Sequence, residues 1–212
     1  MPRTERTADR AIFALHHQAI HVPRVERIAR GMAELADGAG SMLDIGCGNG
    51  LLARRIAELA GADTVRGVDV MVRDETSVPV AQYDGEHLPF DDASFDVITL
   101  CDVLHHAADP RAVVKDAMRV LRPNGRLVIK DHFRLGPVSN AVLLAMDMLG
   151  NYSTGVLVRG TYLSPPQWVE LVAAAGGTVD KLVWPFEVHA LPWRLVTRSE
   201  YQFLMRVVPR RG

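Results

Sequence analysis

The stretch from Met42 to Gly50 constrains the fold of this chain more than any other. An apolar run leads into three glycines at alternate positions, which are Gly46, Gly48 and Gly50. A helix pattern follows at once, with Leu52, Ile56 and Leu59 on one face. Glycine lets a backbone bend sharply and approach a ligand without an intervening Cβ, and the free N–H groups of a helix start point at whatever lies above the turn. The stretch therefore predicts a nucleotide-like ligand at the end of a buried strand.

Strand and helix patterns alternate along the rest of the chain. The predicted strands are residues 41–45, 64–70, 78–83, 95–101, 126–131, 178–184 and 201–208. Predicted helices lie at 11–22, from Pro23 to the Gly38–Gly40 breaker, at 50–59, after the Asp109-Pro110 cap and after the Ser164-Pro165 cap. Continuous apolar strands are typical of a parallel sheet covered on both faces. Because no helix-length pattern separates the last two strands, we expect the final strand to be antiparallel.

We expect residues 1–212 to form a single domain with two additions. Residues 11–37 are predicted to be an N-terminal helical cap. Residues 133–163 form a connection longer than usual, with an apolar helix candidate that carries Val142, Leu143, Met146 and Leu149. Together the two segments are predicted to form a lid over the carboxyl edge of the sheet.

Composition excludes several functions. The net charge of −1 gives no electrostatic argument for nucleic acid or for an anionic membrane surface. No window is as long and apolar as a membrane span. The two cysteines, Cys47 and Cys101, cannot make a disulfide framework. We therefore predict a reduced, cytoplasmic setting.

The spacing of the glycines separates two kinds of ligand. The dinucleotide fingerprint is Gly-x-Gly-x-x-Gly, with a diphosphate on the helix N-terminus. Here the third glycine comes one residue early, and Leu51 stands where that fingerprint has glycine or alanine. Asp44 lies inside the strand just before the turn, which suits an ammonium or a sulfonium better than a diphosphate. The pattern favours a ligand with a positive end.

Five segments resemble, in order, those of the class I S-adenosylmethionine-dependent methyltransferases: Leu43–Gly50, Gly67–Asp69, Tyr83–Phe90, Ser94–Ile98 and Val120–Leu127. The resemblance covers about residues 40–131 and is closest to the small-molecule enzymes of the quinone-biosynthesis type. It implies a Rossmann-like doubly wound, mostly parallel seven-stranded α/β sheet with the last strand antiparallel. It also implies S-adenosylmethionine as cofactor and in-line methyl transfer to a small-molecule acceptor. The short link after Asp69 departs from the family, which usually has a full helix there.

The resemblance also implies a role for each matching residue. Asp69 takes the ribose hydroxyls, since a carboxylate can accept two donors. Asp84 accepts from the adenine amino group, with the Gly85 backbone close by and Val70 against the ring. Asp44 holds the ammonium of the amino-acid part, which lies against the glycine turn. The remaining predicted cofactor-binding residues are Gly46, Cys47, Gly48, Asn49, Gly50 and Cys101.

Candidate catalytic residues follow strands four and five. His105 and His106 come after residues 95–101, and His132 comes after Asp131. Histidine titrates near neutrality and can take a proton from a hydroxyl or amine nucleophile. A metal site built from these three histidines and Asp102 is an alternative. Because no compact ligand spacing supports it, we predict no metal.

The acceptor and two other functions stay open at this stage. The lid segment is rich in Leu, Met and Val, and Tyr152, Tyr162 and Trp168 are near it. This composition fits an apolar or aromatic acceptor, and it fits the core packing of an extra helix equally well. The alternatives to a methyltransferase are an NAD(P)-dependent oxidoreductase and a non-catalytic S-adenosylmethionine-binding protein.

Overall fold

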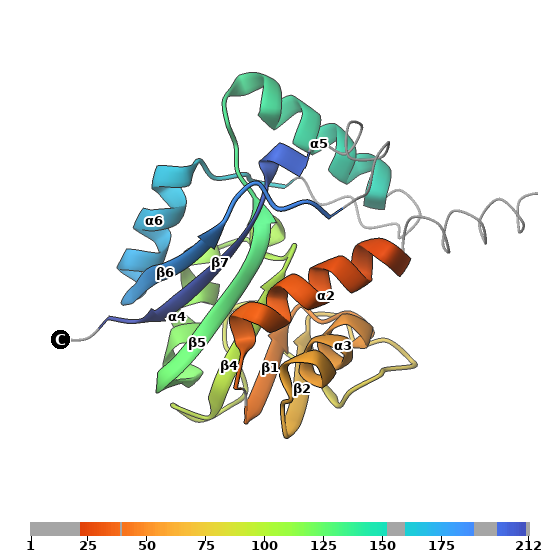
Figure 1. Cartoon of the computed structure of the whole chain (residues 1–212), viewed down its shortest axis with the longest axis vertical. Helices are drawn as coiled ribbons and strands as arrows, with labels where there is room; N and C mark the ends of the chain where they lie inside the picture. The colour runs from red at the N-terminus through yellow and green to blue at the C-terminus, as the bar shows by residue number, and fades with distance from the viewer. Residues whose placement is uncertain (1–21, 39, 152–159, 189–198, 211–212) are drawn as a thin grey trace, which may run out of the picture.

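One seven-stranded sheet organises the described part of the chain. The computed structural model describes residues 22–38, 40–151, 160–188 and 199–210. The strand order is β3-β2-β1-β4-β5-β7-β6 (Figure 1). The strands are β1 (Ser41–Ile45), β2 (Thr64–Asp69), β3 (Val80–Gln82), β4 (Phe95–Cys101), β5 (Leu121–His132), β6 (Gly177–Val183) and β7 (Gln202–Pro209). β7 runs antiparallel to both β5 and β6, whereas the other pairs are parallel. The predicted fold class is confirmed.

Helices cover both faces of the sheet and its carboxyl edge. α2 (Val22–Ala36) and α3 (Leu51–Ala60) pack on one face through Ile28, Met32 and Ile56. α4 (Pro110–Val120) and α6 (Pro165–Ala174) pack on the other through Val114, Trp168 and Leu171. α5 (Pro137–Asn151) lies above the carboxyl edge (Figure 1). Two short 3₁₀ turns, η2 (Leu104–His106) and η4 (Ser199–Tyr201), complete the elements. No helix among the described residues is long and apolar enough to span a bilayer.

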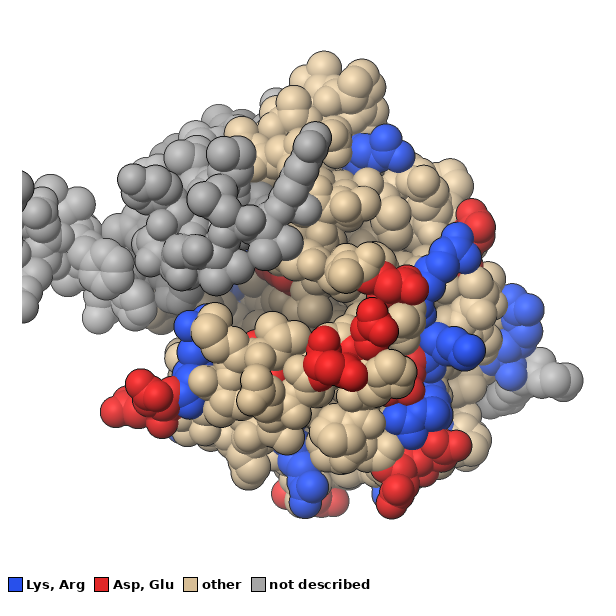
Figure 2. Space-filling model, turned by 180° about the vertical axis from the view of Figure 1, so that it is seen from behind, with Lys and Arg blue, Asp and Glu red and all other residues tan. Residues whose placement is uncertain are grey.

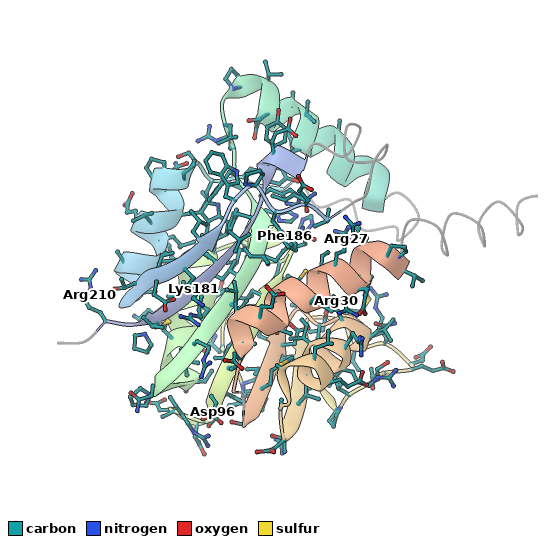
Figure 3. All side chains as sticks on the ribbon, in the orientation of Figure 1. Arg27, Arg30, Asp96, Lys181, Phe186 and Arg210 are labelled. Carbon is teal, nitrogen blue, oxygen red and sulfur yellow. The ribbon has the colours of Figure 1, made fainter. Side chains whose placement is uncertain are left out.

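Local sequence signals explain where the helices begin and how closely they pack. The Asp109 carboxylate accepts hydrogen bonds from the backbone N–H groups of Arg111 and Ala112 at the start of α4, which is the capping role predicted from the sequence. In α2, a Cβ at Gly31 would lie 2.7 Å from Leu204 and 2.8 Å from the Phe186 ring. Glycine therefore lets α2 lie close against β7 and Phe186 (Figure 3).

Two predicted strand boundaries are wrong. Strand three was predicted as residues 78–83, but β3 covers only Val80–Gln82, because Val78 turns inward and packs against Gly50. Strand five was predicted to start at Arg126 after a turn at Asn124-Gly125. Instead, Leu121 already pairs with Phe95, pairing resumes between Arg126 and Val97, and residues 122–125 bulge between the two pairs.

The remaining segment predictions have mixed outcomes. No helix forms between Met71 and Ser77, as the length of that link predicted. The helix candidate of the long insertion is confirmed as α5. The predicted helix at 11–22 lies outside the described residues except for Val22. Tyr152 also lies outside them. The single-domain assignment with its cap (11–37) and lid (133–163) stays a prediction.

Candidate functional site

The predicted site residues lie at the carboxyl edge of the sheet. β1, β2, β4 and β5 are mutually parallel, so their last residues meet at this edge. The strand order reverses between β1 and β4, and ligands of doubly wound sheets bind in the crevice outside such a switch point. The structure brings the glycine turn and Asp69 to one side of that point, and His105 and His132 to the other.

The three glycines of the turn differ in what surrounds them. Gly46, Gly48 and Gly50 all have positive φ, at 71°, 57° and 73°. A Cβ on Gly46 would collide with Val103, and one on Gly50 would collide with Val78. At Gly48 such a Cβ would meet nothing within 4 Å. Gly46 and Gly50 are therefore required by the protein's own packing, and of these three only Gly48 borders open space.

Asp69 is hydrogen-bonded to the backbone of the glycine turn. One of its carboxylate oxygens, Oδ2, accepts from the Gly48 N–H at 2.7 Å, and Oδ1 accepts from the Met71 N–H at 3.0 Å. A carboxylate offers about four lone-pair positions, so two backbone donors leave capacity for two more. The residue is half-buried and lies beside the open space at Gly48.

Asp44 is buried beneath the turn and has no cationic partner among the described residues. Its carboxyl is 3% exposed and accepts a hydrogen bond from the Thr99 hydroxyl. Burial, with a smaller contribution from the charge of Asp69, raises the pKa of Asp44 to about 7, although the Thr99 bond opposes the shift. A carboxyl in this state gains from any positive group placed next to it.

Asp84 and its neighbours lie at the β3 side of the edge. The Asp84 carboxylate accepts from the N–H groups of Glu86 and His87 at 2.8 and 2.7 Å and pairs with the His87 ring. These bonds, with that of the His87 N–H the largest, lower the pKa of Asp84 to about 2. The Val70 side chain is 55% exposed and lies next to Gly85. Asp84 therefore organises an Asp-Gly turn, and its contact with adenine stays a prediction.

Neither cysteine has the properties of a nucleophile. Cys47 is buried against Gly67, and burial raises the pKa of its thiol to about 12. Burial also raises the pKa of Cys101, with the charge of Asp102 adding to the effect. Both thiols are free of disulfides and protonated near neutral pH. They are small residues that line the ends of β1 and β4.

His105 and Asp131 form a buried pair across the ends of β4 and β5. Nδ1 of His105 lies 2.7 Å from Oδ1 of Asp131, and the two side chains are 4% and 1% exposed. Burial would raise the pKa of Asp131, but the charge and hydrogen bond of His105 outweigh it and hold the pKa far below its ordinary value. Because the ionised carboxylate can only accept, Nδ1 is the donor. Nε2 is consequently the basic nitrogen of this ring.

A second carboxylate, Asp102, holds a buried lysine. Nζ of Lys130 lies 2.6 and 2.8 Å from the two oxygens of Asp102, and the Lys130 side chain is 0% exposed. Arg24 of α2 also donates to Asp102, at 3.0 Å. Burial alone would raise the pKa of Asp102, but Lys130, His132 and Arg24 together lower it far below the ordinary value. Asp102 has a positive φ of 57°, unusual for a residue other than glycine.

Aromatic rings gather around His105. Its ring stacks on Tyr162 with centroids 5.0 Å apart and lies 4.1 Å from the His106 ring and 5.6 Å from the His132 ring. The Thr161 N–H donates to the carbonyl of His105 at 2.7 Å. The end of the predicted lid, residues 160–163, is thereby attached to the site. His105, one of the three predicted histidines, is bonded to a carboxylate at hydrogen-bond distance.

Comparison with known proteins identifies the family of this chain. A domain family described as "Methyltransferase domain" matches residues 43–129. The ubiquinone biosynthesis O-methyltransferase of Cereibacter sphaeroides (strain ATCC 17025) is 30% identical over 179 residues, which cover 74% of this chain and 68% of that protein. The chain belongs to the class I S-adenosylmethionine-dependent methyltransferases. The predicted family is confirmed.

Other relatives of this methyltransferase are matched over shorter stretches. The 27-O-demethylrifamycin SV methyltransferase of Amycolatopsis mediterranei is 40% identical over 119 residues, which cover 50% of this chain and 43% of that protein. The chain spans about half the length of the first such relatives. The crystal structure of the YcgJ protein of Bacillus subtilis superposes with a TM-score of 0.62 at 22% identity, covering 87% of this chain and 99% of that one. This likeness shows the fold.

The site of this methyltransferase fits the cofactor that its family implies. The open space at Gly48, the remaining acceptor capacity of Asp69 and the carboxyl of Asp44 all lie around the glycine turn. They offer room, acceptors for a diol and an anion for an ammonium. This donor and acceptor set matches a nucleoside joined to an amino acid.

The same edge has residue types that bind metals. Asp102, His105, Asp131 and His132 have ligand atoms within 4.8 Å of one another. However, the ammonium of Lys130 lies on both oxygens of Asp102, and Nδ1 of His105 is bonded to Asp131. Lys130 thus supplies the positive charge that a cation would bring, and we assign no metal to these residues.

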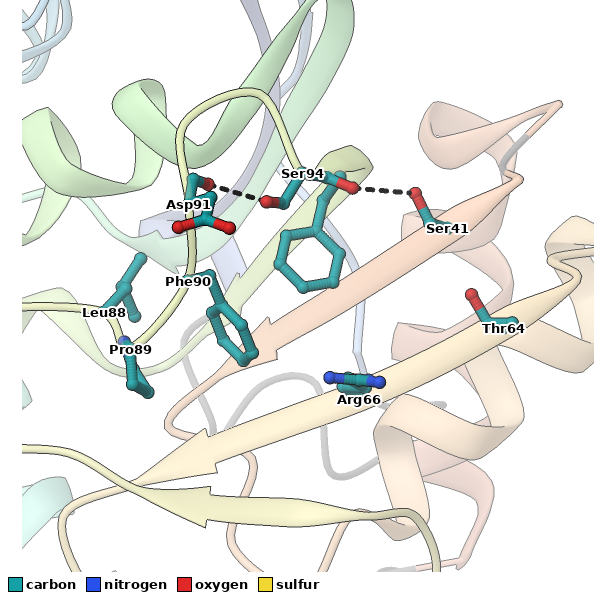
Figure 4. A pocket seen from close by; sticks show the side chains of 9 residues that line it. Ser41, Thr64, Arg66, Leu88, Pro89, Phe90, Asp91 and Ser94 are labelled. Carbon is teal, nitrogen blue, oxygen red and sulfur yellow. Dashed lines mark hydrogen bonds between the residues drawn. The ribbon is translucent and has the colours of Figure 1, made fainter.

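A cavity of about 630 Å³ lies at the opposite end of the sheet of this methyltransferase (Figure 4). It is lined by Ser41, Thr64, Arg66, Leu88, Pro89, Phe90, Asp91, Ser94 and Phe95. Ser41 and Thr64 are the first residues of β1 and β2, so the cavity lies at the amino ends of the strands. It contains none of the predicted site residues, and we place the functional site at the carboxyl edge.

Surface charge agrees with a small ligand. Figure 2 shows a hollow on the face opposite to that of Figure 1, with acidic side chains beside it and Lys and Arg concentrated toward one side. Where the chain is described, this face therefore carries both signs and gives no continuous basic surface for nucleic acid.

Three residues that lie at this edge were not predicted as site residues from the sequence. Lys130 lies in the strand predicted at 126–131, Arg24 lies in the predicted N-terminal cap, and Tyr162 enters the prediction only through the composition of the lid. A lysine inside a strand of otherwise buried residues was the available signal for Lys130, since lysine is rarely buried unless it is paired. No local pattern marks Arg24 or Tyr162.

Proposed function

We propose that this chain transfers a methyl group from S-adenosylmethionine to a hydroxyl of a small-molecule acceptor, with His105 as general base. The buried His105–Asp131 pair at the cofactor edge carries this proposal. The family implies the methyl donor, and two of the relatives described above are named for O-methyl transfer or for an O-demethylated substrate. Both free cysteines support the predicted reducing, cytoplasmic setting.

The cofactor half of the site would be formed by five residues. Asp69 would accept from the ribose diol while it keeps its bond to Gly48. Asp44 would face the ammonium, and Gly48 would leave room for the amino-acid part. Asp84 and Val70 would lie at the adenine end. S-adenosylmethionine, when bound, supplies a methyl group already activated on a sulfonium.

Methyl transfer to the acceptor would depend on removal of the proton of its hydroxyl. A hydroxyl becomes a stronger nucleophile as it loses its proton, and Nε2 of His105 would take that proton while Nδ1 stays bonded to Asp131. The ionised Asp131 would then stabilise the imidazolium that forms. General-base help of this kind contributes about 10²–10⁴-fold. Alignment of the reactants contributes the larger share, about 7–11 kcal/mol in favourable cases.

Two measurements test the proposal. In calorimetric titrations, S-adenosylhomocysteine should bind and NADH should not; the reverse result would refute the cofactor assignment. In a transfer assay with methyl-labelled S-adenosylmethionine and simple catechols as acceptors, Asp131→Asn and His105→Ala should lower turnover by about 10²–10⁴-fold. Affinity for S-adenosylhomocysteine should stay unchanged in both variants. Equal turnover of the wild type and both variants would refute the assignment of the base.

A further inference from the structure

Lys130 is a buried lysine, and burial of its charge costs free energy unless the charge is paired. It lies in β5 with its side chain on the same face as Val128, beneath α2, and it is 0% exposed. Lysine is almost never fully buried unless it is paired. Its ammonium donates to both oxygens of Asp102. The pair lies close to the proposed base, because side-chain atoms of Asp102, His105 and Asp131 lie within 4.8 Å of one another.

Asp102, the carboxylate that the lysine holds, also accepts from Arg24 and lies near the ring of His132. Nδ1 of His132 lies 3.5 Å from Oδ1 of Asp102 and 3.6 Å from Oδ1 of Asp131. Both distances exceed those of a hydrogen bond. Within the described residues, this buried nitrogen has no hydrogen-bond partner. His132 therefore lies between two carboxylates and is bonded to neither.

The charges around His132 affect the pKa of its ring. The ionisable groups that face it or its neighbours are Arg24 from α2, Cys101 and Asp102 at the end of β4, His105 and His106 from η2, Lys130 and Asp131 from β5, and Tyr162. Burial and the charge of Lys130 lower the pKa of His132. The charges of Asp102 and Asp131 and the contact with Asp131 act in the opposite direction, but burial and the Lys130 ammonium outweigh them.

We propose that Lys130 is a positioning residue for methyl transfer: by neutralising Asp102 beside the His132 ring, it keeps that ring uncharged, so that it does not compete with the His105 ring for Asp131. This inference rests on the proposed function for its effect on turnover, but its effect on His132 is independent of catalysis. Without the ammonium, Asp102 would draw a proton onto His132. The resulting imidazolium would lie 3.6 Å from Asp131 and compete with His105 for it.

The experiment compares three variants with the wild type. Lys130→Met removes the charge at similar length, Lys130→Met/Asp102→Asn removes both charges, and Lys115→Met makes the same change at an exposed lysine of α4. The titration of the His132 Cε1–H is followed by NMR in the ligand-free protein and assigned with a His132→Gln variant. In Lys130→Met the apparent pKa of His132 should rise by about one unit or more.

The double variant and the turnover complete the test. The double variant should return the pKa of His132 to within about 0.3 unit of the wild type, because the opposite charges of Lys130 and Asp102 are removed together. Turnover should fall about tenfold in Lys130→Met and recover in the double variant, since one unit corresponds to a factor of ten. Lys115→Met should match the wild type in both readouts.

Each outcome decides for or against the proposal. An unchanged His132 pKa in Lys130→Met, or a double variant that equals the single one, would overturn it. If Lys130→Met does not fold, Asp102→Asn is compared with the double variant; the uncompensated ammonium should lower the His132 pKa by about one unit, and equal values would overturn the proposal. If the wild type itself transfers no methyl group, the proposed function fails, and the NMR titration still judges the role of Lys130.

Discussion

Replacing Asp44 by asparagine should make the ligand-free protein more stable, although Asp44 is a predicted binding residue. The side chain is 3% exposed and has only the Thr99 hydroxyl as a side-chain donor among the described residues. Asparagine keeps an oxygen for that hydroxyl and has nearly the same volume. It removes a charge that the folded protein does not compensate.

The size of the effect follows from the pKa of Asp44, which rises from 3.8 to about 7 on folding. Below the lower value, both the folded and the unfolded chain carry the proton, so the charge costs nothing. As the pH rises, the unfolded chain ionises first, and folding must take up a proton until the pH passes about 7. At about 1.36 kcal/mol per unit, roughly three units give an upper bound of about 4 kcal/mol.

Urea unfolding of the wild type and Asp44→Asn at two pH values measures this difference. Between about pH 5 and pH 8, the gain in the free energy of unfolding of the variant should grow by roughly 2–3 kcal/mol. Shifts in other carboxylates, such as the lowered pKa of Asp131, occur in both proteins and cancel. Asp63→Asn, at an exposed aspartate before β2, should stay within about 0.5 kcal/mol of the wild type. A gain for Asp44→Asn that does not change with pH would refute the reasoning.

Three further predictions concern the cofactor edge and the core. Asp69→Ala should weaken S-adenosylhomocysteine binding by about 1.5–3 kcal/mol or more in calorimetry, because it removes charged acceptors, while Asp74→Ala on the next connection should not. Binding of S-adenosylhomocysteine near neutral pH should release up to one proton from Asp44, seen as a dependence of the calorimetric enthalpy on the ionisation enthalpy of the buffer; no dependence would argue against an ammonium beside Asp44. Trp168→Ala should cost about 3–5 kcal/mol of unfolding free energy in urea, because the indole is 1% exposed in the core between α6 and the sheet.

The sheet could be predicted because its signals are local. Apolar runs, the Asp109-Pro110 cap and the Ser164 cap each fix an element within a few residues of sequence. The errors lie where a distant contact decides. Val78 leaves its predicted strand for Gly50, and Leu121 pairs with Phe95 before the chain bulges.

The candidate site could be predicted only in part, for the same reason. Parallel strands bring their last residues together, so His105 and His132 could be placed at one edge from the sequence. That Asp131 bonds His105 and that Asp102 bonds Lys130 depends on the pairing of Cys101 with Lys130 and on the left-handed backbone of Asp102. Neither the register nor that backbone conformation has a signature in the residues themselves.

The position of β7 affects how the molecule can be assembled during synthesis. Residues 202–209 pair with β5 on one side and β6 on the other, and Gln202 and Phe203 lie opposite His132 and Asp131. On the ribosome, β1 to β4 can pair as soon as they emerge, whereas β5 keeps an open edge and β6 has no strand to join until these residues appear. The half of the crevice assigned to the cofactor is thus complete early. The strand that carries Asp131, the partner of the proposed base, is secured only after residues 202–209 have been translated.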